Sequence, residues 1–416
     1  MSSVDAPAAV PYVFADTFRQ PSAPSIRALM PYATRPGTVS MAGGYPAPEL
    51  FDVDGLRNAN VKVNASLRDY LQYSDIEGQA SLRRALAALS ARRGITCDPD
   101  TELGVTGGSQ QSLSLVARVM LQPGDHAFVE SAAFPNTVNA LKQTGATVHS
   151  VPSGPHGIDL DALESLLITV RPKIVCVVPS FSNPCGATMP RAQRLRLIEL
   201  AARHQFLVIE DDPYGELRFE GDTVPPLIAL ADARTRPWMV YVSSLSKTVA
   251  PGLRLGWMVA PAAIRRRCHM AKASDDMACP AWTQEIVARY LEDGHYENHV
   301  PRIVAAYGSR CRALVDALTE YLPDALTFVR PQGGMFLWGR LTGTIDATQL
   351  LPYAIEHEVV YVPGHVFYSD ASLADRHAMR LSFATMDESQ IRLGIQRLAQ
   401  ALDACRSGAP CAITLP

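Results

Sequence analysis

The chain has 416 residues, 47% of them hydrophobic and 19% charged, which is enough to bury one large core and a second, smaller one. The formal net charge of −3 gives no electrostatic basis for binding nucleic acid or an anionic membrane. No apolar run approaches membrane-spanning length, and the first ten residues lack the basic and apolar regions of a signal peptide. The eight cysteines show neither a C-x-x-C pair nor zinc spacing, so we expect reduced thiols, no metal ion and a cytoplasmic protein.

The N-terminal part begins with a stretch typical of a flexible arm. Residues 1–36 are rich in Pro, Ala and Ser, with a short helical pattern at 25–30. A Gly-Gly-x-Pro turn follows at 43–46, which by itself is ordinary loop chemistry. The spacing of apolar residues then predicts an amphipathic helix over 80–93, which Gly94 ends.

A glycine-rich turn comes next. Gly107, Gly108, Ser109 and Gln110 open a predicted helix that runs to about Leu121. Such a turn presents free backbone N–H groups and the positive end of the helix dipole, which together suit a phosphate. The alternative is a simple helix cap by the serine, because one such turn is a weak signal.

Strands and helices alternate from about residue 100 to 260. Nearly continuous apolar runs predict strands that are buried on both faces. The expected strands cover 126–130, 147–151, 173–178 and 206–211, and the helices between them cover 159–167 and 191–204. This alternation predicts an α/β sheet with functional groups at the strand ends.

Polar residues follow two of these strands. Asn183 lies in an Asn-Pro-x-Gly turn, which in most proteins is only a turn. Asp211 and Asp212 stand side by side at the end of an apolar strand. One of the two carboxylates could provide a fixed anion beside a protonated ring nitrogen.

The stretch around Lys247 has the strongest chemical character. Ser243, Ser244 and Ser246 precede the lysine, Arg254 follows it, and strands are predicted on both sides of the stretch. Hydroxyls and a guanidinium bind phosphate oxygens, and a lysine amine can form a Schiff base with a carbonyl. The alternative is a loop lysine that faces solvent.

The C-terminal part predicts a smaller α+β domain. Residues 281–322 are mostly helical, and short strands are expected within 328–341, 359–364 and 379–384 before a final helix at 388–404. Arg380 lies among apolar residues of the last strand. A buried arginine needs an anionic partner, which is either a structural carboxylate or a ligand.

The stretch around Lys247 resembles the cofactor-lysine signature of the class I/II aminotransferases, which are pyridoxal 5'-phosphate (PLP) enzymes of fold type I. Other segments resemble the family in the same order, from about residue 25 to the C-terminus. The resemblance implies a large α/β domain with a mixed, mostly parallel seven-stranded sheet between helices, and a smaller α+β domain. We expect an N-terminal arm with part of the small domain at 1–55, the large PLP-binding domain at 56–295 and the small C-terminal domain at 296–416.

The resemblance also implies roles around the cofactor ring. Lys247 forms an aldimine with PLP and then acts as the general base. The family spacing Asp-x-x-Tyr selects Asp211 for the ring nitrogen and Tyr214 for the ring oxygen, which Asn183 also binds. Phe134 stands where the family usually has a tyrosine, so it keeps the stacking on the ring but lacks the hydroxyl.

Further residues are assigned by the same resemblance. The cofactor phosphate is expected to contact Gly108, Ser109, Gln110, Ser244, Ser246, Arg254 and, from the neighbouring subunit of a homodimer, Tyr73. On the substrate side, Arg380 binds the α-carboxylate, with Asn183 beside it. Gly44 lines the entrance, and Arg27 reaches a second carboxylate.

The implied function is transfer of an amino group between an L-amino acid and a 2-oxo acid by a ping-pong mechanism. Several stretches are most similar to the 2-aminoadipate and kynurenine aminotransferase subgroup, so we expect glutamate and 2-oxoglutarate as one substrate pair. One alternative is a PLP-dependent β-lyase, or another lyase, on the same fold. The other is a non-catalytic PLP-binding sensor domain of a DNA-binding regulator, against which the short N-terminal segment and the negative net charge argue.

Overall fold

The computed structural model describes residues 12–15, 18 and 26–413, and its largest sheet has seven strands. In spatial order these are β2 (Leu103–Thr106), β10 (Gly256–Val259), β9 (Met239–Ser244), β8 (Leu207–Asp211), β7 (Ile174–Val177), β3 (His126–Glu130) and β4 (Thr147–Val151). β10 is antiparallel to both of its neighbours, whereas β9, β8, β7, β3 and β4 pair in parallel. The predicted mixed, mostly parallel sheet is therefore confirmed.

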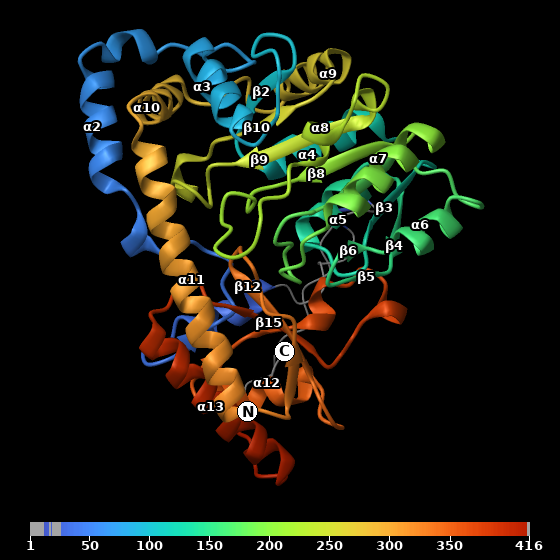
Figure 1. Cartoon of the computed structure of the whole chain (residues 1–416), viewed down its shortest axis with the longest axis vertical. Coiled ribbons are helices and arrows are strands. Elements are labelled where there is room, and N and C mark those ends of the chain that lie inside the picture. Colours follow the sequence, from blue (N-terminus) through green and yellow to red (C-terminus); the bar gives the residue numbers. More distant parts are fainter. Residues whose placement is uncertain (1–11, 16–17, 19–25, 414–416) are drawn as a thin grey trace.

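Helices cover both faces of this sheet (Figure 1). They are α3 (Ala80–Ala91), α4 (Ser109–Met120), α5 (Pro135–Lys142), α6 (Leu160–Leu166), α7 (Arg191–His204), α8 (Leu227–Leu230), α9 (Ala262–Ala273) and α10 (Ala281–Glu292), whereas α2 (Val53–Asn64) packs against α10. Alternate residues of the central strands enter different apolar cores: Val175 and Val208 lie in one, and Cys176 and Ile209 in the other. Burial on both faces explains why these strands read as continuous apolar runs.

A second, four-stranded sheet is formed by the C-terminal part. Its order is β11 (Leu326–Phe328), β12 (Phe336–Leu341), β15 (Ala378–Ser382) and β14 (Val362–Pro363), and α12 (Ala347–Glu356) and α13 (Glu388–Arg406) belong to the same part. The N-terminal strand β1 (Val39–Ser40) pairs in parallel with β13 (Val359–Val360). The beginning of the described chain is thus fastened to the C-terminal part.

The helix α11 (His295–Tyr321) connects the two parts, as Figure 1 shows. With 27 residues it is about 40 Å long. Its first turns bury Tyr296 and Val300 in a core of the seven-stranded sheet, and its later turns bury Ile303 and Leu314 in the core of the four-stranded sheet. One rigid element therefore fixes the two sheets relative to each other.

Most of the strands and helices that the sequence predicts are present, but four helices, α2, α5, α9 and α12, were not predicted, and two predicted segments differ in detail. Residues 359–364 form two short strands that belong to different sheets, with the buried Tyr361 between them. The helical pattern at 25–30 is a 3₁₀ helix, η2 (Ile26–Leu29), followed by α1 (Met30–Ala33), and Ser25 lies outside the described residues. The domain boundaries at 55/56 and 295/296 stay predictions.

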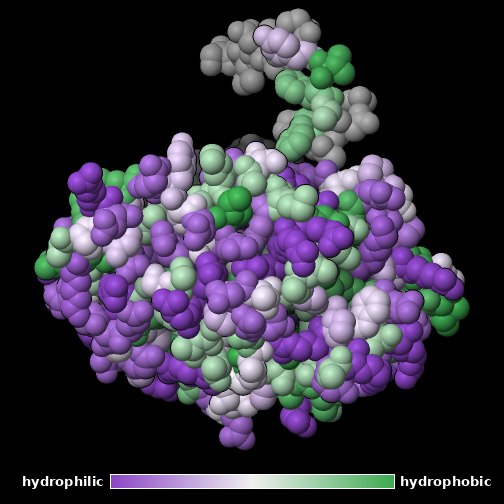
Figure 2. All heavy atoms as spheres, turned by 90° about the horizontal axis from the view of Figure 1, so that it is seen from above, coloured by the Kyte–Doolittle hydropathy of each residue, from purple (hydrophilic) through white to green (hydrophobic). Residues whose placement is uncertain are grey.

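The surface is mixed in character. Figure 2 shows mostly hydrophilic residues on the face seen from above, with apolar residues scattered among them. Within the residues that the structure describes, none of the helices is both long enough and apolar enough to pass through a membrane.

A buried arginine ties the loop that leads to Asn183 to the rest of the large part. The guanidinium of Arg194 is fully buried and donates to the carbonyl oxygens of Met189, Pro225 and Pro179, at 2.9, 3.0 and 2.6 Å, and to the hydroxyl of Ser180 at 3.0 Å. Its nearest carboxylate is Glu210, 3.8 Å away.

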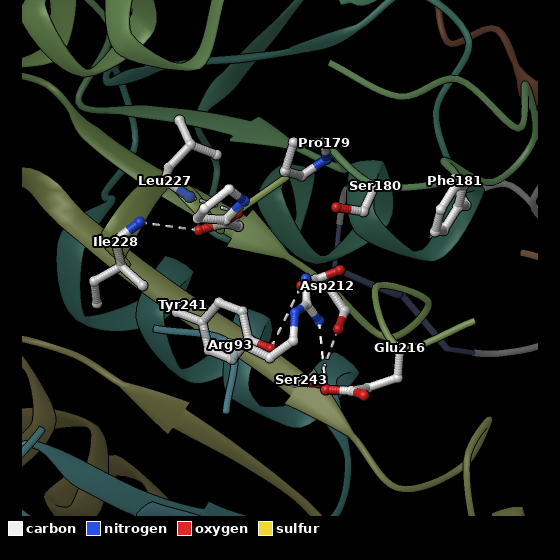
Figure 3. A network of polar contacts seen from close by, with 12 residues as sticks. Arg93, Pro179, Ser180, Phe181, Asp212, Glu216, Leu227, Ile228, Tyr241 and Ser243 are labelled. Atoms are coloured by element: carbon white, nitrogen blue, oxygen red, sulfur yellow. Dashed lines mark hydrogen bonds and ion pairs between the residues drawn. The ribbon is translucent and has the colours of Figure 1, made fainter. Parts of the chain in front are cut away.

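The same carboxylate accepts hydrogen bonds from the N–H groups of Leu227 and Ile228, at the start of α8 (Figure 3). Burial is the main cause that raises the pKa of Glu210 to about 7. The Arg194–Glu210 pair is therefore a desolvated contact that joins three loops, and the loss of its cation leaves several acceptors unpaired.

We predict that Arg194→Met lowers the free energy of unfolding by about 3–5 kcal/mol, because it leaves the buried Glu210 carboxylate without its counterion and three carbonyl oxygens without their donor. Denaturant unfolding followed by circular dichroism measures the change. Arg203→Met is the matched control, since this arginine lies on the same helix with its side chain 64% exposed. Equal stability of the two variants would contradict the prediction.

Candidate active site

The candidate site lies where neighbouring strands of the seven-stranded sheet end. β2 runs into the turn of Gly107 and Gly108, β8 ends at Asp211, and β9 ends at Ser244. Crevices at the carboxyl ends of parallel strands are the usual binding place of α/β sheets. Polar groups from segments far apart in the sequence therefore meet at one edge.

Lys247 lies in the turn after β9 and is partly buried. Its Nζ donates a hydrogen bond of 2.9 Å to the carbonyl oxygen of Gly44. Burial, together with the positive charges of Arg380 and Arg254, lowers the pKa of Lys247 from 10.5 to about 8. The amine is thus more easily deprotonated, and more nucleophilic at neutral pH, than an ordinary lysine.

One carboxylate oxygen of Asp211 has no hydrogen-bond donor in the described chain. This oxygen, Oδ1, is buried. Burial raises the pKa of Asp211 to about 7, the charge of Asp212 adds to this, and a hydrogen bond from Ser109 and the charge of Lys247 oppose it. A cation placed against Oδ1 would supply the charge that this carboxylate lacks.

Asp212 has a different environment from its neighbour. Its fully buried carboxylate lies 3.0 Å from the guanidinium of Arg93, and its backbone oxygen accepts a 2.8 Å hydrogen bond from the Ser243 hydroxyl. Figure 3 shows Arg93 and Asp212 directed at each other, with Tyr241 close by. Asp212 therefore has its counterion within the protein, although its Oδ1 also accepts no hydrogen bond in the described chain, and Asp211 is the acid of the two that has no ion pair there.

Gly215 leaves the space for this ion pair. A Cβ atom at Gly215 would lie 2.3 Å from Nη1 of Arg93 and 2.5 Å from Oδ1 of Asp212. The turn that follows Asp211 thus depends on a glycine for the guanidinium to pass.

Arg380 meets Asn183 and Tyr214 beside these groups. Its guanidinium donates to Oδ1 of Asn183 at 2.7 Å and to the carbonyl oxygen of Ala42 at 2.5 Å. The rings of Phe336 and, farther off, Phe367 flank it, with the guanidinium carbon 4.5 Å from the centre of the Phe336 ring. Its Nε is buried without a partner among the described residues.

The side chains of Tyr214 and Asn183 are also in contact. Burial raises the pKa of the Tyr214 hydroxyl, and its hydrogen bond with Asn183 partly opposes the shift. The phenol is therefore neutral near pH 7 and can donate a hydrogen bond.

The glycine-rich turn forms a cradle with the lysine loop. Gly108 has a φ of +122°, and a Cβ atom there would lie 3.3 Å from Nη2 of Arg254. That arginine donates to the carbonyl oxygen of Gly107 at 2.8 Å. The hydroxyl of Ser244 donates to that of Ser246 at 2.8 Å. Hydroxyls, a guanidinium and the N-terminus of α4 thus face one small region.

Four other predicted site residues form no hydrogen bond to this group of side chains in the structure. Tyr73 is 77% exposed and Arg27 is exposed on η2. The Gln110 amide donates to the carbonyl oxygen of Asn136 at 3.1 Å, and Phe134 precedes α5 as its N-cap. The roles that the resemblance implies for them stay predictions.

The residues present fit PLP. A lysine of lowered pKa can join its aldehyde, the unpartnered Oδ1 of Asp211 suits a protonated ring nitrogen, and the turn at Gly108 suits its phosphate. The same region therefore offers a partner to each polar group of this cofactor.

Sequence reasoning missed several residues around this site. Arg93 lies at the end of a predicted amphipathic helix, where a basic residue usually faces solvent and complements the helix dipole. Gln111, next to the predicted Gln110, has no local signal beyond its place in the phosphate turn. Only the three-dimensional contacts reveal what these side chains bind.

Comparisons with known proteins agree with this geometry. A family model described as aminotransferase class I and II matches residues 43–398. The chain is 36% identical to aromatic-amino-acid aminotransferase 1 of Thermococcus litoralis, with 91% of each chain covered. It is 35% identical to the 2-aminoadipate transaminase of Thermus thermophilus, with 91% of this chain and 94% of the relative covered.

A solved structure is equally similar. The crystal structure of Pyrococcus horikoshii kynurenine aminotransferase in complex with PMP superposes with a TM-score of 0.88 at 35% identity, covering 94% of this chain and 96% of that one. The chain therefore belongs to the class I and II aminotransferases and is a PLP-dependent enzyme that transfers amino groups of amino acids.

Proposed function

We propose that the enzyme transfers an amino group between an L-amino acid and a 2-oxo acid, with glutamate and 2-oxoglutarate as one pair. The second pair has an aromatic or aminoadipate-like side chain. The relatives that are named for aromatic amino acids, 2-aminoadipate and kynurenine support this choice. The observation that carries the proposal is the buried Arg380, whose Nε is unpartnered in the described chain and which lies near the amine of Lys247.

Arg380 binds the α-carboxylate of either substrate. Its hydrogen-bond acceptors in the described chain are neutral oxygens, and burial lowers its pKa to about 10, so an anion relieves its desolvation. A planar guanidinium can bind a carboxylate through two parallel hydrogen bonds. This contact orients the Cα–H bond of the substrate toward the site.

Lys247 moves the proton of the reaction. PLP, when bound, supplies the electron sink that makes the substrate Cα–H acidic. The Lys247 amine, with its pKa near 8, takes that proton as a general base and returns a proton as a general acid. The neighbouring positive charges of Arg380 and Arg254 keep the amine neutral over more of the physiological pH range.

The other residues hold the cofactor. Asp211 provides the anion for the ring nitrogen, Tyr214 and Asn183 bond the ring oxygen, and Phe134 stacks on the ring. The phosphate contacts are those expected from the sequence, namely Gly108, Ser109, Gln110, Ser244, Ser246, Arg254 and the partner's Tyr73. The exposed position of Tyr73 supports a contact with a second subunit.

We also propose that the enzyme is a cytoplasmic homodimer. All eight cysteines are unpaired, which suits a reducing compartment. Leu71, two residues before Tyr73, is 69% exposed, and a subunit contact would bury both side chains.

The reaction is tested by mixing the holoenzyme with one amino acid at a time. We predict that glutamate, and at least one aromatic or aminoadipate-like donor, converts the visible absorption of the lysine-bound cofactor to that of the aminated form. One 2-oxo acid is expected per cofactor, without ammonia. Lys247→Ala is the control, and release of ammonia with the oxo acid would instead identify a β-lyase.

Mixed dimers test whether Tyr73 acts across the subunit interface. Tyr73→Ala and Lys247→Ala are each predicted to have low activity at limiting PLP. In a mixed dimer, one site combines an intact Lys247 with the partner's Tyr73. Random re-association of equal amounts should therefore restore up to about a quarter of wild-type activity. No restoration, despite mixed dimers being present by native mass spectrometry, would contradict the proposal.

Arg27 is predicted to bind the second carboxylate of 2-oxoglutarate. It is exposed on η2, whereas Leu29 of the same short helix is buried in the core of the four-stranded sheet. The helix is thus anchored while its arginine is free to move. We predict that Arg27→Ala raises KM for 2-oxoglutarate by a factor that corresponds to about 1.5–3 kcal/mol, the free energy of one charge-assisted hydrogen bond. The KM for an aromatic donor should stay nearly unchanged.

Steady-state kinetics with both substrates measures this difference. Arg35→Ala is the control, because this exposed arginine stacks on Tyr32, with its guanidinium carbon 4.6 Å from the ring centre. Equal effects of Arg27→Ala on both substrates, or no effect on either, would assign Arg27 to the arm alone.

A further inference from the structure

We propose that Lys272, Asp276 and Gln111 are positioning residues that fix the phosphate-binding turn at Gly107 and Gly108. This phosphate relay, as we name the three side chains, touches neither the reacting atoms nor the substrate. The inference rests on the proposed contact of this turn with the cofactor phosphate.

The relay begins with a buried cation. The side chain of Lys272, in the last turn of α9, is completely inaccessible to solvent, and its Nζ lies 2.5 Å from Oδ1 of Asp276. A buried ammonium needs a counterion, because removal of its hydration is unfavourable. Asp276 supplies that charge from a side chain that is still 40% exposed. The pair therefore fixes the segment after α9 against the body of the protein.

The second oxygen of Asp276 carries the contact to the turn. Its Oδ2 accepts a hydrogen bond of 2.8 Å from Nε2 of Gln111, and Oε1 of Gln111 accepts one of 2.7 Å from the backbone N–H of Gly107. Two donors thus face the two carboxylate oxygens, and this also sets the orientation of the glutamine amide. Burial raises the pKa of Asp276, but the hydrogen bonds from Lys272 and Gln111 outweigh it, so that the pKa is lowered overall.

The relay ends on the turn itself. The N–H of Gly107 is held by Gln111 and its carbonyl oxygen by Arg254, so both peptide groups of this residue have a fixed direction. Gly108 follows with a φ of +122°, and α4 begins at Ser109. The free N–H groups at the start of α4 therefore point in a direction that the relay sets.

Ligand binding can distinguish two roles of the relay, namely positioning of the phosphate-binding turn and stabilisation of the fold alone. If the relay only stabilised the packing of α4 against α9, its loss would weaken binding of any ligand of the site. If the relay positions the phosphate-binding turn, its loss weakens the binding of PLP. The binding of pyridoxal, which lacks the phosphate, is then unaffected.

The test uses the full-length chain, freed of cofactor and titrated with PLP or with pyridoxal, with binding followed by visible absorption. Asp276→Asn has one acceptor oxygen where the carboxylate has two, so either Lys272 or Gln111 then faces an N–H₂ group. We expect Asp276→Asn and Gln111→Leu each to raise Kd for PLP about tenfold or more. Kd for pyridoxal should change less than twofold.

Asp275→Asn is the matched control. Asp275 is the adjacent residue, and it pairs with Arg118 at the surface, where the two side chains are 37% and 41% exposed. Both Kd values should remain those of the wild type in this variant.

Two results would overturn the inference: an unchanged Kd for PLP in both relay variants, or equal losses for PLP and pyridoxal. A different failure would belong to the proposed phosphate contact. In that case the wild type would bind PLP no more tightly than pyridoxal. Circular dichroism of each variant verifies the fold before titration.

Discussion

The desolvated cation of Arg380 is the constraint on which the site depends. Three separate parts of the chain surround it: the N-terminal segment contributes the carbonyl oxygen of Ala42, the loop that follows β7 of the large sheet contributes Asn183, and β15 of the small sheet carries the arginine. The ion pairs found among the described residues do not include it, and its two hydrogen-bond acceptors there are uncharged. Burial of an unpaired guanidinium is unfavourable, so the fold keeps a cation that an incoming carboxylate can stabilise.

The two adjacent acids at the end of β8 are buried negative charges, and they differ in whether the protein provides a counterion. Asp212 forms an ion pair with Arg93, whereas Asp211 takes part in no ion pair among the described residues, although each acid keeps one buried oxygen without a donor there. Figure 3 shows that Arg93 reaches Asp212 from a different part of the chain. In the described chain Asp212 thus has a counterion, whereas Asp211 and Arg380 have none, and these are the two charges that we propose face ligands. Buried charged groups that have no counterion in the protein are typical of functional sites.

Local sequence predicted much of this arrangement. Apolar runs marked β7 and β8 because those strands are buried on both faces, and helical spacing marked α3 and α7. The choice of Asp211 over Asp212 came from the resemblance to the family, because nothing nearby in the sequence separates two adjacent aspartates. The split of 359–364 between two sheets was not predictable, since pairing partners lie far away in the sequence.

Long-range polar contacts were the hardest part to predict. Arg93 follows the C-terminus of α3 and Lys272 lies in the last turn of α9, where a basic side chain normally reaches solvent, yet both side chains are buried because Asp212 and Asp276 provide the counterions. The helices α2, α5, α9 and α12 were not anticipated either. Two of them have capping residues in the sequence, Asp52 before α2 and the Asp346–Gln349 capping box of α12, and the four helices pack mainly on other helices, which the sequence alone does not reveal.

The central claim is that Lys247 is the residue that bonds the cofactor. Borohydride reduction of the holoenzyme converts a lysine–PLP double bond into a stable amine, and peptide mapping by mass spectrometry then locates the phosphopyridoxyl group. The account predicts that the group is on Lys247 alone, at about one per subunit, and is absent from Lys247→Ala. A stoichiometric label on any other lysine, or an unlabelled Lys247 in an enzyme that holds PLP, would contradict it.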